Sequence, residues 1–140
     1  MGYTTQFDGE FRFTTELTGS QLATLGRFFG CDCREYPEWE PPRYATYIDL
    51  AFTTDFGGIE HDGSEKSSLS ADMVNMLIRL MRQTMPEFGL TGELLAQGED
   101  IDDRYYLRID MYARCVKIPI VATGQKVKCP QCEHVFRINE

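Results

Sequence analysis

The chain contains no apolar run long enough to cross a bilayer, and its start lacks a charged segment followed by an apolar signal core. We therefore expect a protein of the cytosol that makes no membrane contact. The chain is also poor in positive charge, because 14 Lys and Arg stand against 22 Asp and Glu, giving a net charge of -8. An acidic body repels nucleic acid at long range, which disfavours direct nucleic-acid binding by most of this chain.

Familiar catalytic and phosphate-binding motifs are missing as well. The glycines at 57–58 and 89–92 are not followed by Gly-Lys-Ser/Thr, so they do not form a phosphate loop. The acidic segment at 99–103 lacks the ligand spacing and the glycine of a calcium loop. No cysteine or serine stands in a glycine-framed nucleophile motif. We therefore predict that the protein is not an enzyme, and no small-molecule substrate is evident.

The charge that is present divides the chain unevenly. Residues 114–140 hold five Lys or Arg against two Glu, a balance of +3, which leaves -11 for residues 1–113. A length of 140 residues suits one domain with a short appendix. We predict an α+β domain over residues 1–113 and a basic, cysteine-bearing tail over residues 114–140.

The strongest periodic pattern lies between Ser70 and Met85, where apolar residues recur at helical spacing. Ser70 suits the N-cap of this helix, and Pro86 stops it. A strand at Leu90 to Glu99 follows. The opposite side of the helix carries polar residues that we interpret as a solvated surface, namely Asn75, Arg79 and Arg82.

Shorter patterns supply the other elements. Strands are expected where apolar residues alternate with polar ones, and a short helix where Thr18 and Gln21 have capping-box spacing and Gly30 ends the apolar stripe. The expected strands are Gln6 to Leu17, Tyr44 to Phe52, Gly58 to His61 and Arg104 to Val116. The order β-α-β-β-α-β-β predicts a two-layer α+β fold. In it, both helices cover one face of a mostly antiparallel, ferredoxin-like sheet.

Several motifs also resemble a family of small uncharacterised proteins of phages and prophage regions. These are the start Met1-Gly2-Tyr3-Thr4-Thr5 with Phe7 and Gly9, Asp62-Gly63-Ser64-Glu65-Lys66, and Gly92-Glu93 leading into Gln97-Gly98-Glu99-Asp100 and Asp102-Asp103. The resemblance covers most of residues 1–113. It departs at Ala96, where family members commonly have Trp, and after Lys66, where serines replace an aromatic residue. The resemblance implies a compact domain of phage or bacterial origin and carries no recognised activity.

The tail contains one motif typical of metal binding. Cys129 and Cys132 are separated by two residues in Lys-Cys-Pro-Gln-Cys-Glu-His, which looks like the second knuckle of a zinc ribbon. Cys115 occupies half of the expected first knuckle, where Tyr112 stands in place of the other cysteine. The sequence therefore predicts a structural zinc ion held by Cys115, Cys129, Cys132 and a fourth ligand, with a metal-free β-hairpin as the alternative.

The fourth zinc ligand stays open between His134 in the tail and Cys31 or Cys33 in the loop at residues 31–43. That loop is interrupted by three prolines and carries the only tryptophan, Trp39, among acidic and aromatic neighbours. Trp39 either contacts a partner protein or covers the edge of the sheet. A second acidic segment, the turn formed by Glu99, Asp100, Asp102 and Asp103, is the other candidate contact with a partner.

Together these patterns favour a phage-encoded or prophage-encoded interaction module that binds a host or viral protein. One form of this hypothesis is an acidic inhibitor of a host complex that handles nucleic acid or provides defence. Such an inhibitor would occupy the basic binding surface of that complex. The alternative is an accessory factor that binds nucleic acid through its zinc-ribbon tail, and a third hypothesis is an enzyme whose site carries no recognised motif.

Overall fold

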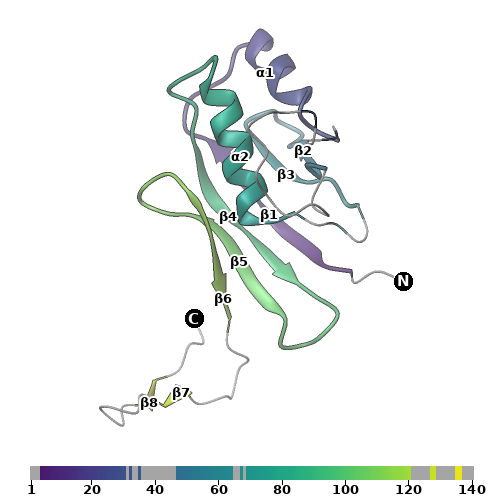
Figure 1. The fold of residues 1–140 in the computed structure, drawn as a ribbon, viewed down its shortest axis with the longest axis vertical. Helices are drawn as coiled ribbons and strands as arrows, with labels where there is room; N and C mark the ends of the chain where they lie inside the picture. The colour runs from purple at the N-terminus through teal and green to yellow at the C-terminus, as the bar shows by residue number, and fades with distance from the viewer. Residues whose placement is uncertain are drawn as a thin grey trace.

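The computed structural model describes residues 4–30, 32, 35, 47–64, 67 and 69–120, together with the short strands at 127–128 and 135–136. These residues form two helices and eight strands (Figure 1). In chain order they are β1 (Gln6–Phe13), α1 (Gly19–Gly26), β2 (Leu50–Phe52), β3 (Gly58–His61), α2 (Ala71–Arg82), β4 (Leu90–Gln97), β5 (Arg104–Ile109), β6 (Cys115–Pro119), β7 (Val127–Lys128) and β8 (Val135–Phe136).

One antiparallel sheet organises the protein. Its six strands lie in the order β2-β3-β1-β4-β5-β6, and every neighbouring pair is antiparallel. The predicted α+β architecture with a mostly antiparallel sheet and two helices is therefore confirmed. β7 and β8 pair with each other in a separate antiparallel ladder.

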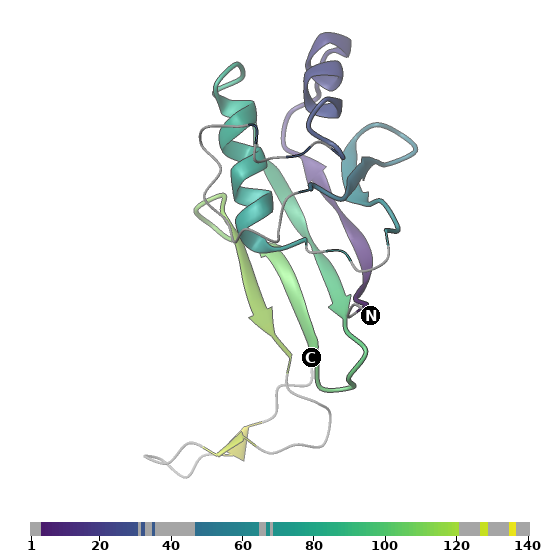
Figure 2. The same ribbon diagram turned by 45° about the vertical axis from the view of Figure 1, so that its right-hand side comes forward.

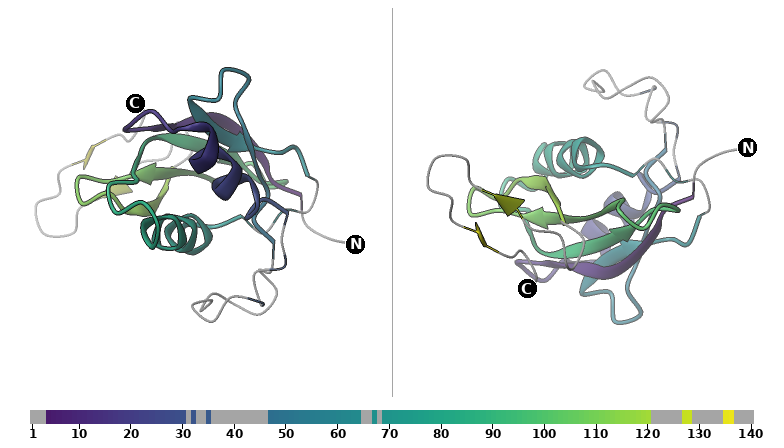
Figure 3. Two further views of the ribbon diagram at one scale, coloured as in Figure 1. Left: turned by 90° about the horizontal axis from the view of Figure 1, so that it is seen from above. Right: turned by 90° about the horizontal axis from the view of Figure 1, so that it is seen from below.

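Helix α2 forms where the sequence pattern predicts it, although it ends at Arg82 rather than at Met85, and it covers one face of the sheet (Figure 3). The Ser70 hydroxyl at its N-cap accepts a hydrogen bond from the amide of Met73 at 3.4 Å. Its buried side chains are Met73, Val74, Met76, Leu77, Ile78, Leu80 and Met81. The strands contribute their inward-facing residues, such as Phe11 and Leu94, which are fully buried. Burying this helix against the sheet is what makes one hydrophobic core.

Helix α1 is short and is fixed mainly by its ends. Thr18 and Gln21 form the predicted capping box, with the Gln21 amide donating to the Thr18 hydroxyl at 3.2 Å and the Thr18 amide donating to the Gln21 side chain at 2.8 Å. Leu25 is fully buried and joins the same core as α2. Just beyond the helix, the ring of Phe29 lies edge-on to that of Phe52 on β2, with 5.0 Å between centroids.

The first predicted strand, Gln6 to Leu17, is too long, since β1 ends at Phe13. The last backbone bonds on this strand are Phe13 N to Gly57 O and Thr14 N to Gly89 O, both 3.0 Å. Beyond that point neither β3 nor β4 continues alongside, so residues 14–17 have no partner strand. The prediction was wrong there because alternation of apolar and polar residues does not provide a neighbouring strand with which to form hydrogen bonds.

The fifth predicted strand, Arg104 to Val116, is two strands joined by a tight turn. The Asp110 carboxylate accepts hydrogen bonds from the amides of Tyr112 at 2.9 Å and Arg114 at 3.0 Å, and Ala113 adopts a φ of 63°. The chain therefore reverses, and β6 returns beside β5 (Figure 2). Residues 115–119 of the predicted tail consequently lie in the main sheet.

The strand predicted at Tyr44 to Phe52 is only partly formed. β2 spans Leu50–Phe52, and Tyr47 makes an isolated antiparallel bridge with Asp32. Residues 44–46 lie outside the described residues.

Candidate functional site

The turn between β4 and β5 carries the acidic residues predicted to contact a partner. It is closed by backbone hydrogen bonds from Gly98 N to Asp103 O at 2.7 Å and from Asp103 N to Asp100 O at 3.0 Å. The side-chain amide of Gln97 donates to the carbonyl oxygens of Gly98 and Asp100, each at 3.0 Å. These bonds hold the backbone of the turn in one shape, so its backbone would lose little conformational entropy on any binding event.

An isoleucine stands in the middle of this acidic turn. The side chain of Ile101 is 80% exposed, although an isoleucine is normally buried. Glu99, Asp100 and Asp102 beside it are also exposed, and Asp103 is half-buried. The Glu99 carboxylate accepts a hydrogen bond from the amide of Thr4 at 2.6 Å, which ties the start of the chain to the turn. The turn thus presents one apolar side chain surrounded by carboxylates.

The second predicted contact, Trp39, lies outside the described residues. The same holds for Cys31 and Cys33, two of the candidate fourth zinc ligands. Their proposed roles stay predictions.

Cys115 is the one predicted zinc ligand that the structure describes. Its side chain is only 3% exposed and faces the core from β6. Burial raises the pKa of the Cys115 thiol to about 12, with the carboxylates of Asp110 and Asp72 adding to the effect. Zinc binds thiolate, and a bound zinc ion itself deprotonates a coordinating thiol, so the raised pKa of the metal-free thiol does not decide whether Cys115 is a zinc ligand. Its role as a zinc ligand stays a prediction.

The remaining predicted zinc ligands, Cys129, Cys132 and His134, fall in the sequence between β7 and β8 and lie outside the described residues. Within the part of the chain that is described, no three His, Cys, Asp or Glu side chains come together to hold a metal ion. The zinc site stays a prediction.

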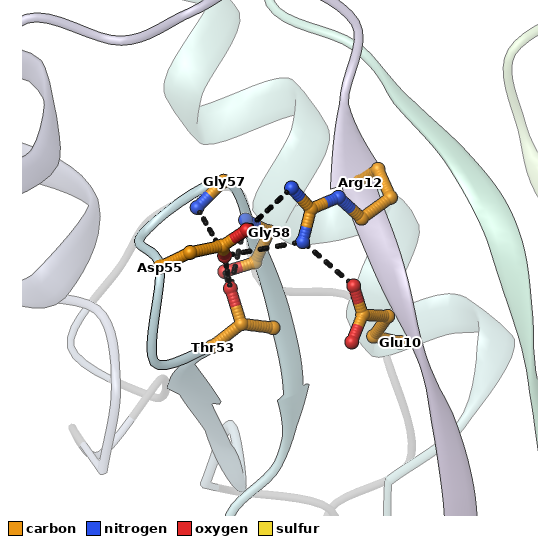
Figure 4. Close-up of polar contacts among 6 residues, drawn as sticks. All are labelled: Glu10, Arg12, Thr53, Asp55, Gly57 and Gly58. Atoms are coloured by element: carbon orange, nitrogen blue, oxygen red, sulfur yellow. Dashed lines mark hydrogen bonds and ion pairs between the residues drawn. The ribbon is translucent and has the colours of Figure 1, made fainter.

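A polar cluster ties the turn between β2 and β3 to β1 (Figure 4). The Arg12 guanidinium on β1 donates to both carboxylate oxygens of Asp55, at 2.9 and 3.2 Å, and to Glu10 at 2.7 Å. Asp55 also accepts from the Thr53 hydroxyl at 2.7 Å and from the Gly57 amide at 2.9 Å. The bonds from Arg12 and Thr53 hold the pKa of Asp55 well below its usual range. These bonds join the turn between β2 and β3 to β1 and fix the shape of the hairpin.

Asn75 has a role that the sequence did not reveal. Its side-chain amide donates to the carbonyl oxygen of Cys115 at 2.9 Å, and its side-chain oxygen accepts from the amide of Cys115 at 2.7 Å. These are the outward-facing backbone groups of β6 at the edge of the sheet. A side chain on α2 therefore pairs with the edge strand where a further strand would otherwise bind. In the sequence, Asn75 is simply one polar residue of the helix beside its apolar face, and nothing there indicates a contact with β6.

His61 on β3 is held in its neutral form. Its Nδ1 accepts a hydrogen bond from the Gly63 amide at 3.1 Å, and its ring stacks on Phe7 with 4.4 Å between centroids. Its Nε2 is buried and has no hydrogen-bond partner among the described residues. Burial lowers the pKa of His61. Because Nδ1 must stay unprotonated to accept, protonation opposes this arrangement.

We therefore expect stability to fall as the pH drops. The unfolded chain protonates His61 near pH 6.5, whereas the folded protein resists it, so below that pH the unfolded state binds more protons and gains relative stability. The thermal midpoint of the native protein should decrease between pH 7.5 and pH 5.5 by more than that of His61→Gln. Equal decreases in the two proteins would show that His61 titrates identically in both states.

No helix of the described residues combines the length and the apolar character needed to span a membrane. Compared with protein families, with characterised proteins and with solved structures, the chain matches none.

Proposed function

We propose that the protein is a non-enzymatic interaction module, encoded by a phage or prophage, that binds a basic surface of a host or viral protein through the turn between β4 and β5. The observation that carries this proposal is the exposed Ile101 among four carboxylates in a turn held by its own hydrogen bonds. No catalytic role is assigned to any side chain.

The composition of the turn suits a protein partner with a basic rim around a small apolar pocket. An exposed isoleucine gains free energy by entering such a pocket, at about 25 cal/mol for each Å² of apolar surface buried. The carboxylates around it would meet lysines or arginines, which raises the association rate and selects among partners. Because the turn is already ordered, little conformational entropy is lost on binding.

The acidic body suggests what kind of basic surface is bound. Residues 1–113 carry a charge of -11, and the proteins that present large basic surfaces are chiefly those that handle nucleic acid. The protein would then act in the host cytosol as an inhibitor that occupies the nucleic-acid site of a host complex, including a defence complex.

The test begins with identifying the partner by pull-down from host lysate and mass spectrometry, and then measures binding with purified components. Replacing Glu99, Asp100, Asp102 and Asp103 by lysine should abolish binding while leaving the thermal midpoint nearly unchanged. Ile101→Ser should weaken binding without altering the charge. A duplex of DNA or RNA should compete with the protein for the partner.

The matched control compares two double variants of equal charge change. Asp100→Lys with Asp102→Lys alters the turn, and Glu16→Lys with Glu87→Lys alters exposed carboxylates elsewhere. The first pair should weaken binding far more than the second. If both pairs have the same effect, only the overall charge matters, and if neither has any, the contact lies on another surface.

The accessory-factor alternative draws support from the antiparallel pairing of β7 with β8, where Val127 lies opposite Phe136. A zinc-ribbon knuckle is a β-hairpin whose turn carries the cysteines, and Cys129 and Cys132 stand between these two strands in the sequence. In this second candidate function the basic tail would bind nucleic acid, with affinity that falls steeply as salt is added.

We also infer that the fold is a ferredoxin-like arrangement with an added hairpin. Support comes from the strand order β2-β3-β1-β4 in the sheet and from the alternation of strands and helices along the chain. β5 and β6 would be the added hairpin. The proposed binding turn, between β4 and β5, lies where this hairpin begins.

A further inference from the structure

A second surface lies at the other end of the β5 strand from the acidic turn, between α2 and the turn joining β5 to β6 (Figure 1). It holds a cavity of about 460 Å³. Three arginines line it, Arg79 and Arg82 from the helix and Arg114 from the turn. Asp72, Asn75 and two apolar side chains complete the lining.

Fixed contacts shape both walls of this cavity. On the helix side, Asn75 binds the backbone of Cys115 through two hydrogen bonds of 2.7 and 2.9 Å, which locks α2 to β6. On the other side, the Asp110 carboxylate holds the turn through the amides of Tyr112 and Arg114. The cavity is therefore formed before any ligand arrives.

The guanidinium groups at the cavity are weakly engaged by the protein. Arg79 donates one bond to the sulfur of Met76 at 3.7 Å, and Arg82 uses its Nε to reach the carbonyl oxygen of Phe88 at 2.8 Å. Arg114 contacts the Asp110 carboxylate at 3.5 Å, lies over the ring of Tyr112 at 5.4 Å from its centroid, and is 66% exposed. Each guanidinium has five N–H donors, so most of the donors at this cavity have no protein acceptor among the described residues.

The convergence of like charges also calls for an explanation. Arg79 and Arg82 lie three residues apart on one helix, where equal charges repel. The negative end of the helix dipole favours arginines in the last turn, which accounts for these two. Arg114 reaches the same cavity from the opposite wall, where its 3.5 Å contact with Asp110 offsets part of its charge. The lining of the cavity itself holds three arginines and one carboxylate, Asp72.

We propose that this cavity binds a phosphate monoester of nucleotide size. A phosphate dianion accepts paired hydrogen bonds from guanidinium groups and neutralises their mutual repulsion. The volume falls within the range of small-ligand pockets. Asp72 lies seven residues before Arg79, about 10 Å along the helix, and its carboxylate can accept a hydrogen bond from a hydroxyl or amino group of the ligand. In adenosine 5′-monophosphate the amino group of the base lies at about that separation from the phosphate, and the ribose hydroxyls lie closer to it.

The same phosphate monoester occurs on a free nucleotide and at the 5′ end of a nucleic-acid strand. The experiment therefore uses three probes with the full chain: adenosine 5′-monophosphate, a short single-stranded oligonucleotide with a 5′-phosphate, and the same oligonucleotide with a 5′-hydroxyl. Binding is measured by titration calorimetry in a phosphate-free buffer at low salt.

We expect saturable binding of adenosine 5′-monophosphate, of the phosphorylated oligonucleotide or of both, and none of the hydroxyl form. Arg79→Gln and Arg114→Gln should each weaken it at least about tenfold. Arg104→Gln removes the same charge from a half-buried position on β5 outside the cavity and should leave ligand binding unchanged. Thermal midpoints of all variants establish that they fold.

The relative strength of the two phosphorylated probes identifies the source of the phosphate. Tighter binding of the nucleotide indicates a small-molecule ligand, and tighter binding of the phosphorylated oligonucleotide indicates a strand end. The proposal is overturned if neither phosphorylated probe saturates the protein below about 5 mM. It is equally overturned if both oligonucleotides bind alike, or if Arg104→Gln weakens binding as much as the two cavity variants. None of these results depends on the acidic turn.

Discussion

Leu77→Ala should lower the free energy of unfolding by roughly 2–5 kcal/mol. Leu77 is fully buried in the cluster that joins α2 to the sheet. Removing its isobutyl group eliminates apolar contacts on both layers and leaves a cavity that the surrounding side chains fill only partly. Urea denaturation followed by circular dichroism measures the change as a lower midpoint with an unchanged slope.

The matched control for this variant is Leu77→Met, which nearly conserves the side-chain volume. It should cost less than about 1.5 kcal/mol, because methionine adapts its shape and the cluster already contains Met73, Met81 and Met85. A wild-type urea midpoint for Leu77→Ala would mean that α2 does not pack on the sheet.

Gly58→Ala should destabilise the protein by roughly 3 kcal/mol, at the upper end of the cost of overfilling a packed site. Gly58 begins β3 and pairs with Arg12 of β1. A methyl group there would overlap the carbonyl oxygen of Phe11 and approach the Arg12 Cα to 3.2 Å. Both neighbours are backbone atoms in the middle of the sheet, so they cannot move aside without separating β1 from β3.

Gly19→Ala is the matched control for the glycine substitution. Gly19 is the first residue of α1, and a methyl group there meets no atom within 4 Å. Alanine favours the helix, so this variant should be neutral or slightly more stable. Thermal denaturation of both variants tests the difference. Equal midpoints would show that β1 and β3 do not approach as closely as described.

The acidic turn can be identified from the sequence, whereas the arginine cavity cannot. Four acidic residues within five positions are visible without a structure, and only the exposure of Ile101 had to be added. The cavity needed three dimensions, because Arg114 is more than thirty positions from Arg79 and Arg82 in the chain. The sequence predicts a solvated surface on their side of α2, since no local pattern indicates that a turn packs beside it.

The sequence by itself determined the local elements. The apolar period and the Ser70 cap specified α2, the capping box at Thr18 specified the start of α1, and alternation located β1, β3, β4 and β5, because each signal depends only on residues within one or two turns. Only the tertiary structure decided where β1 stops, how the chain reverses at Asp110, and that Asn75 pairs with the edge of β6. Those features depend on which strand lies alongside and which side chain reaches across, and such partners are distant in the chain.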